Sequence, residues 1–169
     1  MKTNNLVNTH QLTLLAVIVA ANVAIARVFL IPIPMTHGNV NLCDTGIFLT
    51  AWLFGSKKGG VVGGLSGFLL DLISGYPQYM VFSLIVHGLE GFIVGKLTED
   101  KKISAKSLIV SLIAGVLFMV LGYLVSDSLL YKFSTGIIAV PMNIIQGLAG
   151  AIVAVPLFWR LKKLVIKRL

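Results

Sequence analysis

Residues 107–126 read Ser-Leu-Ile-Val-Ser-Leu-Ile-Ala-Gly-Val-Leu-Phe-Met-Val-Leu-Gly-Tyr-Leu-Val-Ser, and this stretch contains no charged side chain. Lys106 precedes it and Asp127 follows it, so charge bounds the run at both ends. An α-helix needs about 20 predominantly apolar residues to cross the hydrocarbon core of a bilayer. The run therefore predicts a transmembrane helix, which we place at residues 104–126.

The rest of the chain is similarly apolar. Of its 169 residues, 57% are hydrophobic and 12% are charged, whereas about 25% of the residues in a soluble domain are charged. The mean hydropathy is +0.95. A chain of this composition lacks the polar residues to cover a water-facing surface, so a soluble fold is excluded and a lipid bilayer is the expected surrounding.

Five further apolar runs surround the first, and glycine, proline or charged residues separate them. Pro32 and Pro34 end the earliest run, because proline lacks the backbone N–H that continues a helix. The second and third runs are short, and a re-entrant hairpin is an alternative for that pair. The sequence thus predicts an all-α, polytopic membrane protein, a single domain over residues 1–169, with six transmembrane helices at 11–31, 41–55, 59–75, 78–97, 104–126 and 136–159.

The first run has one competing interpretation, a cleaved signal peptide. Lys2 precedes it, and Ala24-Ile25-Ala26 fits the small residues of a cleavage site. The apolar run continues beyond that point to Ile31, which favours a permanent transmembrane helix.

The distribution of basic residues predicts the orientation. Twelve of the 14 Lys and Arg residues fall on one side of a six-helix arrangement, and only Arg27 and Lys132 fall on the other. Cytoplasmic loops are enriched in Lys and Arg, so both termini are expected in the cytoplasm of a multi-pass protein of the cell membrane. The net charge of +8 therefore reflects the orientation of the protein in the membrane. It does not indicate a surface that binds nucleic acid, so no nucleic acid partner is expected. The twelve are Lys2, Lys57, Lys58, Lys96, Lys101, Lys102, Lys106, Arg160, Lys162, Lys163, Lys167 and Arg168.

The chain has no motif for nucleotide hydrolysis or for a catalytic nucleophile. Residues 91–98, Gly-Phe-Ile-Val-Gly-Lys-Leu-Thr, resemble the phosphate loop G-x-x-x-x-G-K-[ST], but the two glycines are one residue too close and Leu97 follows the lysine. The single cysteine, Cys43, excludes an internal disulfide and a CxxC metal site. It is expected at the outer end of the second helix, open to reagents added outside. We expect no enzyme, no cofactor and no metal site.

Four hydrogen-bonding side chains lie at similar depth in two predicted helices. His87 and Glu90 are three residues apart in the fourth helix, and Asn143 and Gln146 are three residues apart in the sixth. That spacing places each pair on one helix face, and ionisable groups inside a membrane are functional candidates. Two interpretations remain open, a substrate pocket reached from outside and hydrogen bonding between helices without a ligand.

Further side chains are candidates for the same pocket. Tyr123, near the outer end of the fifth helix, offers a surface for stacking. The loop at 32–41 contains two prolines, a glycine and several polar residues, so it is either a lid over the pocket or a plain surface loop. The predicted substrate contacts are His87, Asn143, Glu90, Gln146, Tyr123, Asn39 and Asn41.

Charged residues also fall near the outer ends of the first three helices. They are Arg27, Asp44 and Asp71. Since unpaired charges are costly inside a membrane, we predict a structural ion pair that neutralises them.

Small residues mark one face of the first helix. Ala16, Ala20 and Ala24 recur at four-residue spacing and therefore share that face. Small residues permit close helix approach in lipid. The face either packs against another helix of the chain or docks a partner subunit.

Glycine and acidic residues recur through the second, third and fourth helices. The segments that carry this pattern are Asp44, Leu53-Phe54-Gly55, Gly59, Gly63-Gly64, Gly67-Phe-Leu-Leu-Asp71-Leu-Ile-Ser-Gly-Tyr-Pro77 and Gly88-Leu-Glu-Gly91-Phe-Ile-Val-Gly95. With them, the chain resembles the substrate-binding S components of energy-coupling factor (ECF) vitamin transporters over nearly its whole length. It is most similar to the branch assigned to hydroxymethylpyrimidine, thiamine-precursor or pyridoxine uptake, which also carries a riboflavin-type label.

The resemblance implies a function. An S component captures its vitamin outside a bacterial plasma membrane and docks through the alanine face of its first helix onto a membrane coupling subunit, the T component. Two cytoplasmic ATPase subunits drive that module, and the S component topples in the membrane to carry its pocket inward. The branch often has lysine where His87 stands, so the vitamin stays open among hydroxymethylpyrimidine, pyridoxine, thiamine-related compounds, riboflavin and others.

Two other classes of protein fit the sequence. A stand-alone ion-coupled secondary transporter would use Asp71 or Glu90 as a proton relay, and uptake by the chain alone would identify it. A non-transporting membrane scaffold would hold no small molecule after mild purification.

Overall fold

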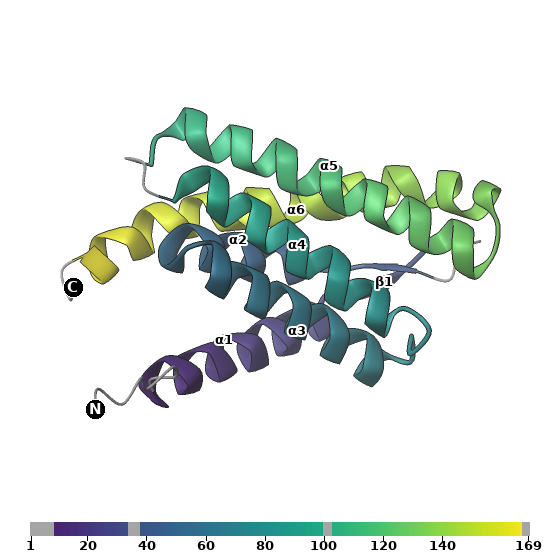
Figure 1. The fold of residues 1–169 in the computed structure, drawn as a ribbon, viewed down its shortest axis with the longest axis horizontal. Helices are drawn as coiled ribbons and strands as arrows, with labels where there is room; N and C mark the ends of the chain where they lie inside the picture. The colour runs from purple at the N-terminus through teal and green to yellow at the C-terminus, as the bar shows by residue number, and fades with distance from the viewer. Residues whose placement is uncertain (1–8, 34–37, 100–102, 167–169) are drawn as a thin grey trace, which may run out of the picture.

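The computed structural model describes residues 9–33, 38–99 and 103–166, which form six α-helices and one short β-hairpin (Figure 1). The all-α prediction is confirmed, and each predicted helix has a counterpart. Four helices, α1, α4, α5 and α6, are long and apolar enough to cross a membrane. The helices are α1 (Thr9–Val28), α2 (Cys43–Phe54), α3 (Ser56–Ser74), α4 (Met80–Thr98), α5 (Ala105–Leu130) and α6 (Phe133–Ile166), and the strands are β1 (Ile31–Pro32) and β2 (Asn39–Val40).

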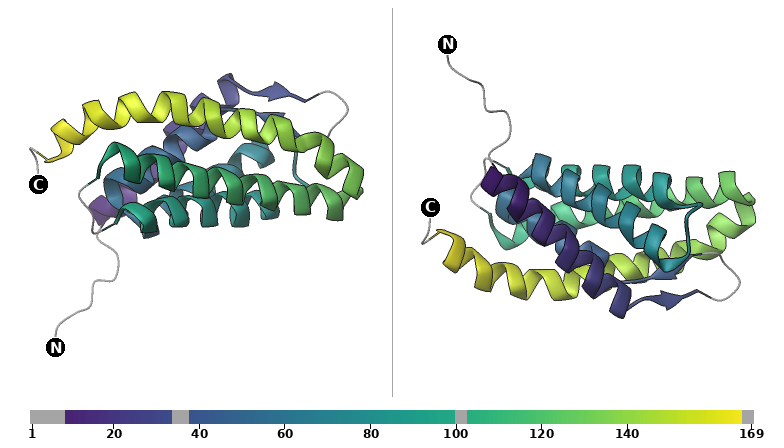
Figure 2. Two further views of the ribbon diagram at one scale, coloured as in Figure 1. Left: turned by 90° about the horizontal axis from the view of Figure 1, so that it is seen from above. Right: turned by 90° about the horizontal axis from the view of Figure 1, so that it is seen from below.

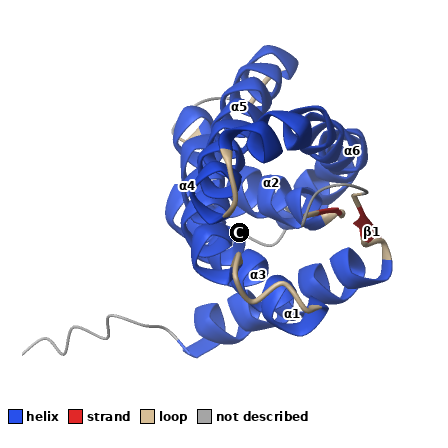
Figure 3. Cartoon of the chain, turned by 90° about the vertical axis from the view of Figure 1, so that its right-hand side faces the viewer, coloured by secondary structure: helices blue, strands red, loops and turns tan. Residues whose placement is uncertain are grey.

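The short helix α2 occupies the centre of the bundle. Seen end-on, it lies inside the ring formed by the other helices (Figure 3). Eight of its 12 residues are buried. α1 lies at one side of the bundle, where it packs mainly against α3 and α2. A central helix touches little lipid, so α2 does not need the length of a bilayer-crossing helix.

The two ends of the bundle differ in charge. α1 begins and α6 ends at one end, here named the terminal end, and the β1–β2 hairpin lies at the other, the hairpin end (Figures 1 and 2). Most of the basic residues in the described helices fall in turns at the terminal end. Those at the terminal end are Lys57, Lys58, Lys96, Lys106, Arg160, Lys162 and Lys163.

Glycines bring the backbones of α3 and α4 into direct contact. A methyl group at Gly63 would overlap the backbone oxygen of His87, and one at Gly91 would overlap that of Gly59. Lipid is as apolar as the side chains, so helix association in a bilayer depends on close packing of this kind.

At the terminal end, Ser56 Oγ and Lys96 Nζ donate to Glu99 at 3.0 and 3.3 Å, which lowers the pKa of that carboxyl.

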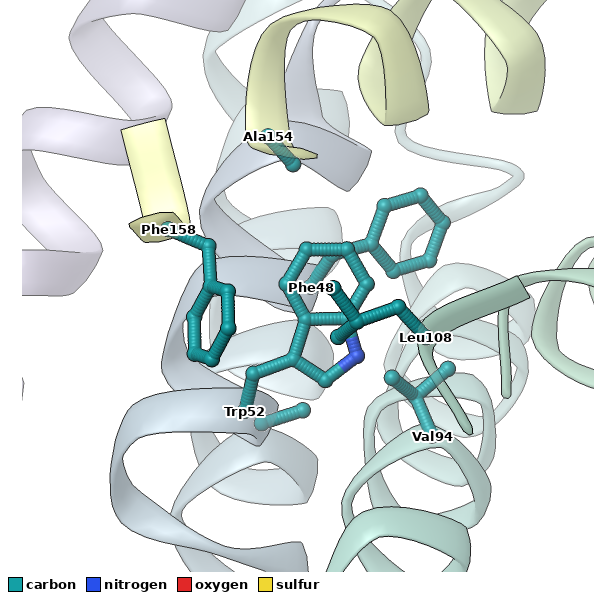
Figure 4. Close-up of a cluster of buried hydrophobic side chains, with 7 residues drawn as sticks. Phe48, Trp52, Val94, Leu108, Ala154 and Phe158 are labelled. Atoms are coloured by element: carbon teal, nitrogen blue, oxygen red, sulfur yellow. The ribbon is translucent and has the colours of Figure 1, made fainter. Parts of the chain in front are cut away.

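Aromatic side chains fill the bundle between its centre and the terminal end. Phe48 and Trp52 of α2 stack with ring centroids 5.9 Å apart, and Phe158 of α6 meets Trp52 edge to face at 5.4 Å (Figure 4). Leu108 of α5 packs into the same cluster. Trp52 Nε1 donates to Ser111 Oγ at 3.1 Å, so the one polar atom of that ring is satisfied. The cluster joins α2 to the outer helices on the side away from the hairpin.

The bounds of all six helices differ from the prediction, and the length of α6 differs most. α6 covers Phe133–Ile166 rather than 136–159, and it contains Pro141 and Pro156. Proline is tolerated inside a transmembrane helix because neighbouring groups satisfy the freed backbone carbonyls. α1 ends earlier than predicted, at Val28, because the chain turns there into β1, which pairs with β2.

We expect one methyl group added at the closest point of the α3–α4 contact to destabilise the protein. Gly63→Ala places Cβ against a backbone oxygen, which cannot swing away as a side chain does. Overpacking of this kind costs about 1–3 kcal/mol, so the midpoint of thermal unfolding in detergent should fall by several degrees.

Gly88→Ala is the matched control on the facing helix. Its Cβ would meet its nearest neighbours at 3.6 Å, an ordinary van der Waals distance, so the midpoint should change little. Equal midpoints for the two variants would contradict the close approach of α3 and α4.

Candidate functional site

A small cavity lies at the hairpin end, enclosed by α3, α4, α5, α6 and the hairpin. Its volume is about 30 Å³, counted as the space open to the centres of water molecules. That is room for about one or two waters. Polar residues form most of its lining, which comprises Ile33, Gly38, Asn39, Asn41, Gly67, Leu70, Asp71, Tyr79, Ser83, His87, Tyr123, Asp127, Ala139, Asn143 and Gln146.

His87 joins the cavity to a buried acidic pair behind it. The residue lies in α4, about 10 Å along the helix from its start at Met80. His87 Nδ1 is 2.8 Å from Glu90 Oε2 and 3.5 Å from Asp44 Oδ1. Both carboxylates are fully buried. Since Nδ1 faces the carboxylates, Nε2 is the ring nitrogen left for a ligand.

The acidic pair is incompletely hydrogen-bonded. Both side-chain oxygens of Asp44 and Oε1 of Glu90 are buried without a hydrogen-bond partner in the described part of the chain. The ligand atoms of Asp44, His87 and Glu90 all lie within 4.8 Å of one another, a spacing that also suits a metal ion. His87 Nδ1 and Glu90 Oε2 lie 2.8 Å apart, so each side chain already satisfies part of the hydrogen-bonding capacity of the other.

Hydroxyl groups and carboxylates form the wall between α3, α4 and α5. Ser83 Oγ donates to Asp71 Oδ2 and lies 2.6 Å from the Tyr123 hydroxyl. The Tyr79 hydroxyl donates to Asp127 Oδ1, which links the start of α4 to the end of α5. The Tyr123 ring meets the His87 ring edge to face, with 5.5 Å between centroids. This wall therefore combines hydrogen-bond acceptors with aromatic surface.

Amide side chains form the opposite wall, from α6 and the hairpin. The backbone N–H of Asn41 donates to Gln146 Oε1 at 3.2 Å, and Asn41 Nδ2 donates to Asn39 Oδ1 at 2.9 Å. Asn41 Oδ1 accepts from the Cys43 N–H at 2.8 Å, at the start of α2. Asn143 Nδ2 is buried and has no hydrogen-bond partner among the described residues. It is a donor placed in the cavity wall and left for a ligand.

Comparison with known proteins identifies the family of the chain. The chain matches the family model described as ECF-type riboflavin transporter, S component, over residues 6–163. The chain belongs to this family. The thiamine precursor transporter HmpT of Lactococcus lactis subsp. cremoris (strain MG1363) is 37% identical over 148 residues, which cover 87% of this chain and 84% of that protein. An uncharacterised protein of Pyrococcus woesei is 36% identical over 133 residues, 79% of this chain and 88% of its own.

Membership of the family settles the class of protein. An S component is part of a transporter, so the chain is not an enzyme, as the missing catalytic motifs predicted. Its long apolar helices make it a multi-pass membrane protein. The family description names riboflavin and the Lactococcus relative is named for a thiamine precursor, so membership leaves the vitamin open.

The structure brings most of the predicted substrate contacts of this S component together. His87, Asn143, Gln146 and Tyr123 line the cavity, as do Asn39 and Asn41 of the hairpin. Glu90 does not line it but lies directly behind His87. The substrate-binding role of these seven residues stays a prediction.

Four polar lining residues were absent from the predicted site. They are Tyr79, Ser83, Asp127 and Asp71, the last of which was assigned to an ion pair. Asp127 follows the uncharged run at 107–126, and an acidic residue at such a boundary is typical of a helix end. Its contact with Tyr79 depends on how α4 and α5 pack, which the sequence does not display.

The predicted ion pair of Arg27 with Asp44 or Asp71 is not formed. Arg27 is exposed, and it makes no ion pair within 4.0 Å in the described chain. The adjacent Ala26 is fully buried and defines the inward face of α1, so the next residue is turned about 100° away from it. Asp44 and Asp71 instead face His87 and Ser83.

The expectation for Cys43 is also wrong. Its side chain is fully buried at the start of α2, where reagents added outside do not reach it. The thiol lies 3.5 Å from Asn22 Nδ2 of α1, because the central position of α2 turns this residue towards α1 and away from the surface.

The alanine face of α1 points away from the bundle. Ala16, Ala20 and Ala24 are exposed, whereas α1 packs against α3 and α2 through Val19, Asn22, Val23 and Ala26. Internal packing of the alanine face, one of the two interpretations of its spacing, is therefore wrong. The face is available to lipid or to another protein.

Proposed function

We propose that this S component binds a thiamine precursor of the hydroxymethylpyrimidine type in the cavity at the hairpin end. The observation that carries the proposal is the buried polar cavity itself, enclosed by four helices and placed away from the basic end. The relative named as a thiamine precursor transporter supports the choice of substrate.

The chemistry of the cavity suits a substituted aminopyrimidine. Such a ring offers an amino group as a donor, ring nitrogens as acceptors and a hydroxyl that does both. Asp71 is a carboxylate acceptor in the cavity wall, and Asn143 Nδ2 is a buried donor that suits a ring nitrogen. The rings of His87 and Tyr123 supply aromatic surface for the flat heterocycle.

The size of the cavity favours a single ring. At about 30 Å³ the cavity must widen for any vitamin, and the displacement is smallest for one pyrimidine or pyridine ring. Riboflavin has three fused rings and a sugar-alcohol chain, so it requires a larger rearrangement of the wall. We therefore rank hydroxymethylpyrimidine first, pyridoxine second and riboflavin after them.

We also propose six transmembrane segments, with both termini in the cytoplasm of a bacterial plasma membrane and the hairpin end outside. The basic residues at the terminal end support this orientation through the positive-inside rule. α2, with 12 residues, counts as a segment because it lies inside the ring of helices and is shielded from lipid.

Delivery of the vitamin requires energy that this chain does not supply. We propose that α1 docks through Ala16, Ala20 and Ala24 onto a membrane coupling subunit, the T component, driven by two cytoplasmic ATPase subunits. The exposure of the three alanines in the isolated chain supports this assignment. Small side chains permit close approach of a partner helix in lipid.

Removing the unpaired amide of the cavity should weaken vitamin binding without unfolding the protein. Asn143 Nδ2 has no hydrogen-bond partner among the described residues, so Asn143→Ala breaks no hydrogen bond that the structure shows for that atom. It leaves one polar atom of the bound ligand unpaired, at a cost of about 1–3 kcal/mol. Calorimetric titration with hydroxymethylpyrimidine should show roughly a five- to hundredfold loss of affinity.

Two companion variants sharpen this test. Ile144→Ala, on the exposed face of the same helix, should bind like the parent. His87→Ala should lose both affinity and thermal stability, because it removes the Nδ1 contact of the buried Glu90 Oε2. If Asn143→Ala and His87→Ala both fold and bind like the parent, the vitamin site lies elsewhere. Titrations with pyridoxine, thiamine and riboflavin test the ranking of substrates.

Engineered cysteines test the orientation. Cys43 is fully buried, so the parent chain should give little background labelling. Lys132→Cys, between α5 and α6 at the hairpin end, should react with an impermeant maleimide added to intact cells. Lys163→Cys, near the end of α6, should react only after permeabilisation. The reverse pattern would overturn the proposed orientation.

Adding bulk to the alanine face should abolish docking but not binding. We expect Ala20→Leu to retain calorimetric vitamin affinity and to lose co-purification with co-expressed coupling and ATPase subunits. Ile25→Leu, at an exposed residue of α1 turned at least about 100° from the three alanines, is the control that should assemble normally. Normal assembly of Ala20→Leu would remove the alanine face from the interface, and ATPase-independent uptake would indicate a secondary transporter instead.

A further inference from the structure

A second hollow lies on the flank of the bundle, on a different surface from the vitamin cavity. α1 packs mainly against α3 and α2, and α6 packs mainly against α5 and α2, so a strip of α2 stays open between α1 and α6. The resulting groove has a volume of about 370 Å³, counted in the same way as the 30 Å³ of the cavity. Its lining comprises Leu14, Ile18, Ala21, Asn22, Ile25, Leu42, Thr45, Gly46, Leu49, Thr50, Leu53, Phe54, Leu157 and Leu161.

The groove presents mainly hydrocarbon to its occupant. Only three of its lining residues are polar, namely Asn22, Thr45 and Thr50. The side chain of each donates to a backbone carbonyl oxygen of the bundle, at 3.0, 3.3 and 2.7 Å respectively. These polar groups are therefore engaged within the protein, and the groove suits an apolar chain better than a polar vitamin.

The length of the groove matches one leaflet of a bilayer. Its lining residues on α1 run from Leu14 to Ile25, about 17 Å along that helix. The hydrocarbon core of a typical bilayer is about 30 Å thick, so one leaflet contributes about 15 Å. A transmembrane helix of a partner would continue across both leaflets, whereas a single acyl chain ends near the midplane.

Two basic side chains flank the groove at the terminal end. Lys58 Nζ lies 5.7 Å from the centroid of the Phe54 ring, which lines the groove. Arg160 of α6 follows the lining residue Leu157 by three positions, so the two side chains are neighbours on the helix surface. The groove is therefore apolar along its length and positively charged at one mouth.

These two cations have no acidic partner in the described chain. Neither Lys58 nor Arg160 makes an ion pair within 4.0 Å there, whereas Lys96 at the same end pairs with Glu99. Lys and Arg side chains that are not engaged by carboxylates are suited to a phosphate group.

The other mouth of the groove carries no such charge. Arg27 is the basic residue of α1 near the hairpin end, but it stands two positions after the lining residue Ile25 and is thus turned about 160° from it. The arrangement of charge therefore places an anionic headgroup at the terminal end of the groove.

We propose that the groove binds one anionic phospholipid, with an acyl chain along α2 and the headgroup phosphate at Lys58 and Arg160. The acyl chain completes the cover over α2 that α1 and α6 leave open, and the phosphate neutralises two cations. The inference requires only that the chain lies in a bilayer. It is therefore independent of the proposed substrate and of the proposed orientation.

Native mass spectrometry of the full chain in mild detergent tests the choice of headgroup. The protein is mixed with equal amounts of phosphatidylglycerol and phosphatidylcholine that carry identical acyl chains. We expect the chain to retain one phosphatidylglycerol in preference to phosphatidylcholine by at least about tenfold, because basic residues near the membrane surface attract a headgroup with net negative charge.

Charge removal tests the place of the headgroup. Lys58→Gln/Arg160→Gln should lower the retention of phosphatidylglycerol by at least about tenfold. Lys57→Gln/Lys163→Gln is the matched control, because it removes the same charge from the same end. Lys57 lines a separate shallow surface between α3 and α4, and Lys163 is turned about 120° from Leu157. The control should retain the lipid like the parent.

Added bulk tests the place of the acyl chain. Ala21 is an exposed lining residue, so Ala21→Phe puts a ring into the groove and should lower lipid retention by at least about tenfold. Ala20→Phe adds the same bulk outside the lining and should leave lipid retention by the isolated chain unchanged. The charge variants alter side chains at the terminal surface, so the test does not depend on the folding of Ala21→Phe alone.

The contrary outcomes are distinct. Equal retention of the two lipids by the parent overturns the preference for an anionic headgroup, and equal losses in the two charge variants overturn the assignment to Lys58 and Arg160. Parental retention by a folded Ala21→Phe variant places the lipid outside the groove. If the parent retains neither lipid, the proposal is overturned, and a dimer that Ala21→Phe disrupts would assign the groove to a second copy of the chain.

Discussion

The contact between the backbones of α3 and α4 is the constraint on which the cavity depends. Gly63 lies under the backbone oxygen of His87, and Gly67 lies beside its ring and beside Ser83. Side chains at these glycines would push α4 outward and separate Ser83 from Asp71, which now share a hydrogen bond across the two helices. Because lipid gives no hydrophobic drive for helix association, this fit of backbone against backbone is what positions the cavity wall.

The central position of α2 allows the protein to hold polar side chains in its interior. A membrane protein that binds a polar molecule needs a polar interior and an apolar exterior, the reverse of a soluble domain. α2 carries Asp44, Thr45 and Thr50 among its buried residues, and the outer helices screen these groups from lipid. The helix thereby supplies polar groups next to the cavity while the bilayer meets mainly apolar side chains such as Ile113 and Ile152.

The helices and part of the site were predictable from the sequence for physical reasons. Lipid requires uninterrupted apolar runs, so each helix is visible as such a run, and helix geometry sets the similar depth of His87 and Asn143. The rotation of each helix about its own axis is set by packing and is not visible in a single sequence. Arg27 was therefore assigned a buried partner although it faces outward, and Cys43 was assigned an outer surface although it is buried.

The outward-facing apolar side chains form a belt of uneven height. On α3 they run from Val61 to Ile73, about 18 Å along the helix, whereas on α6 they run from Phe133 to Leu164, about 46 Å. The hydrocarbon core of a typical bilayer is about 30 Å thick. One flank is thus too short for the membrane and the other too long, a mismatch that tilts the protein or deforms the lipid around it. The thickness of the membrane would thereby contribute to the energy of any tilt of this protein in the bilayer.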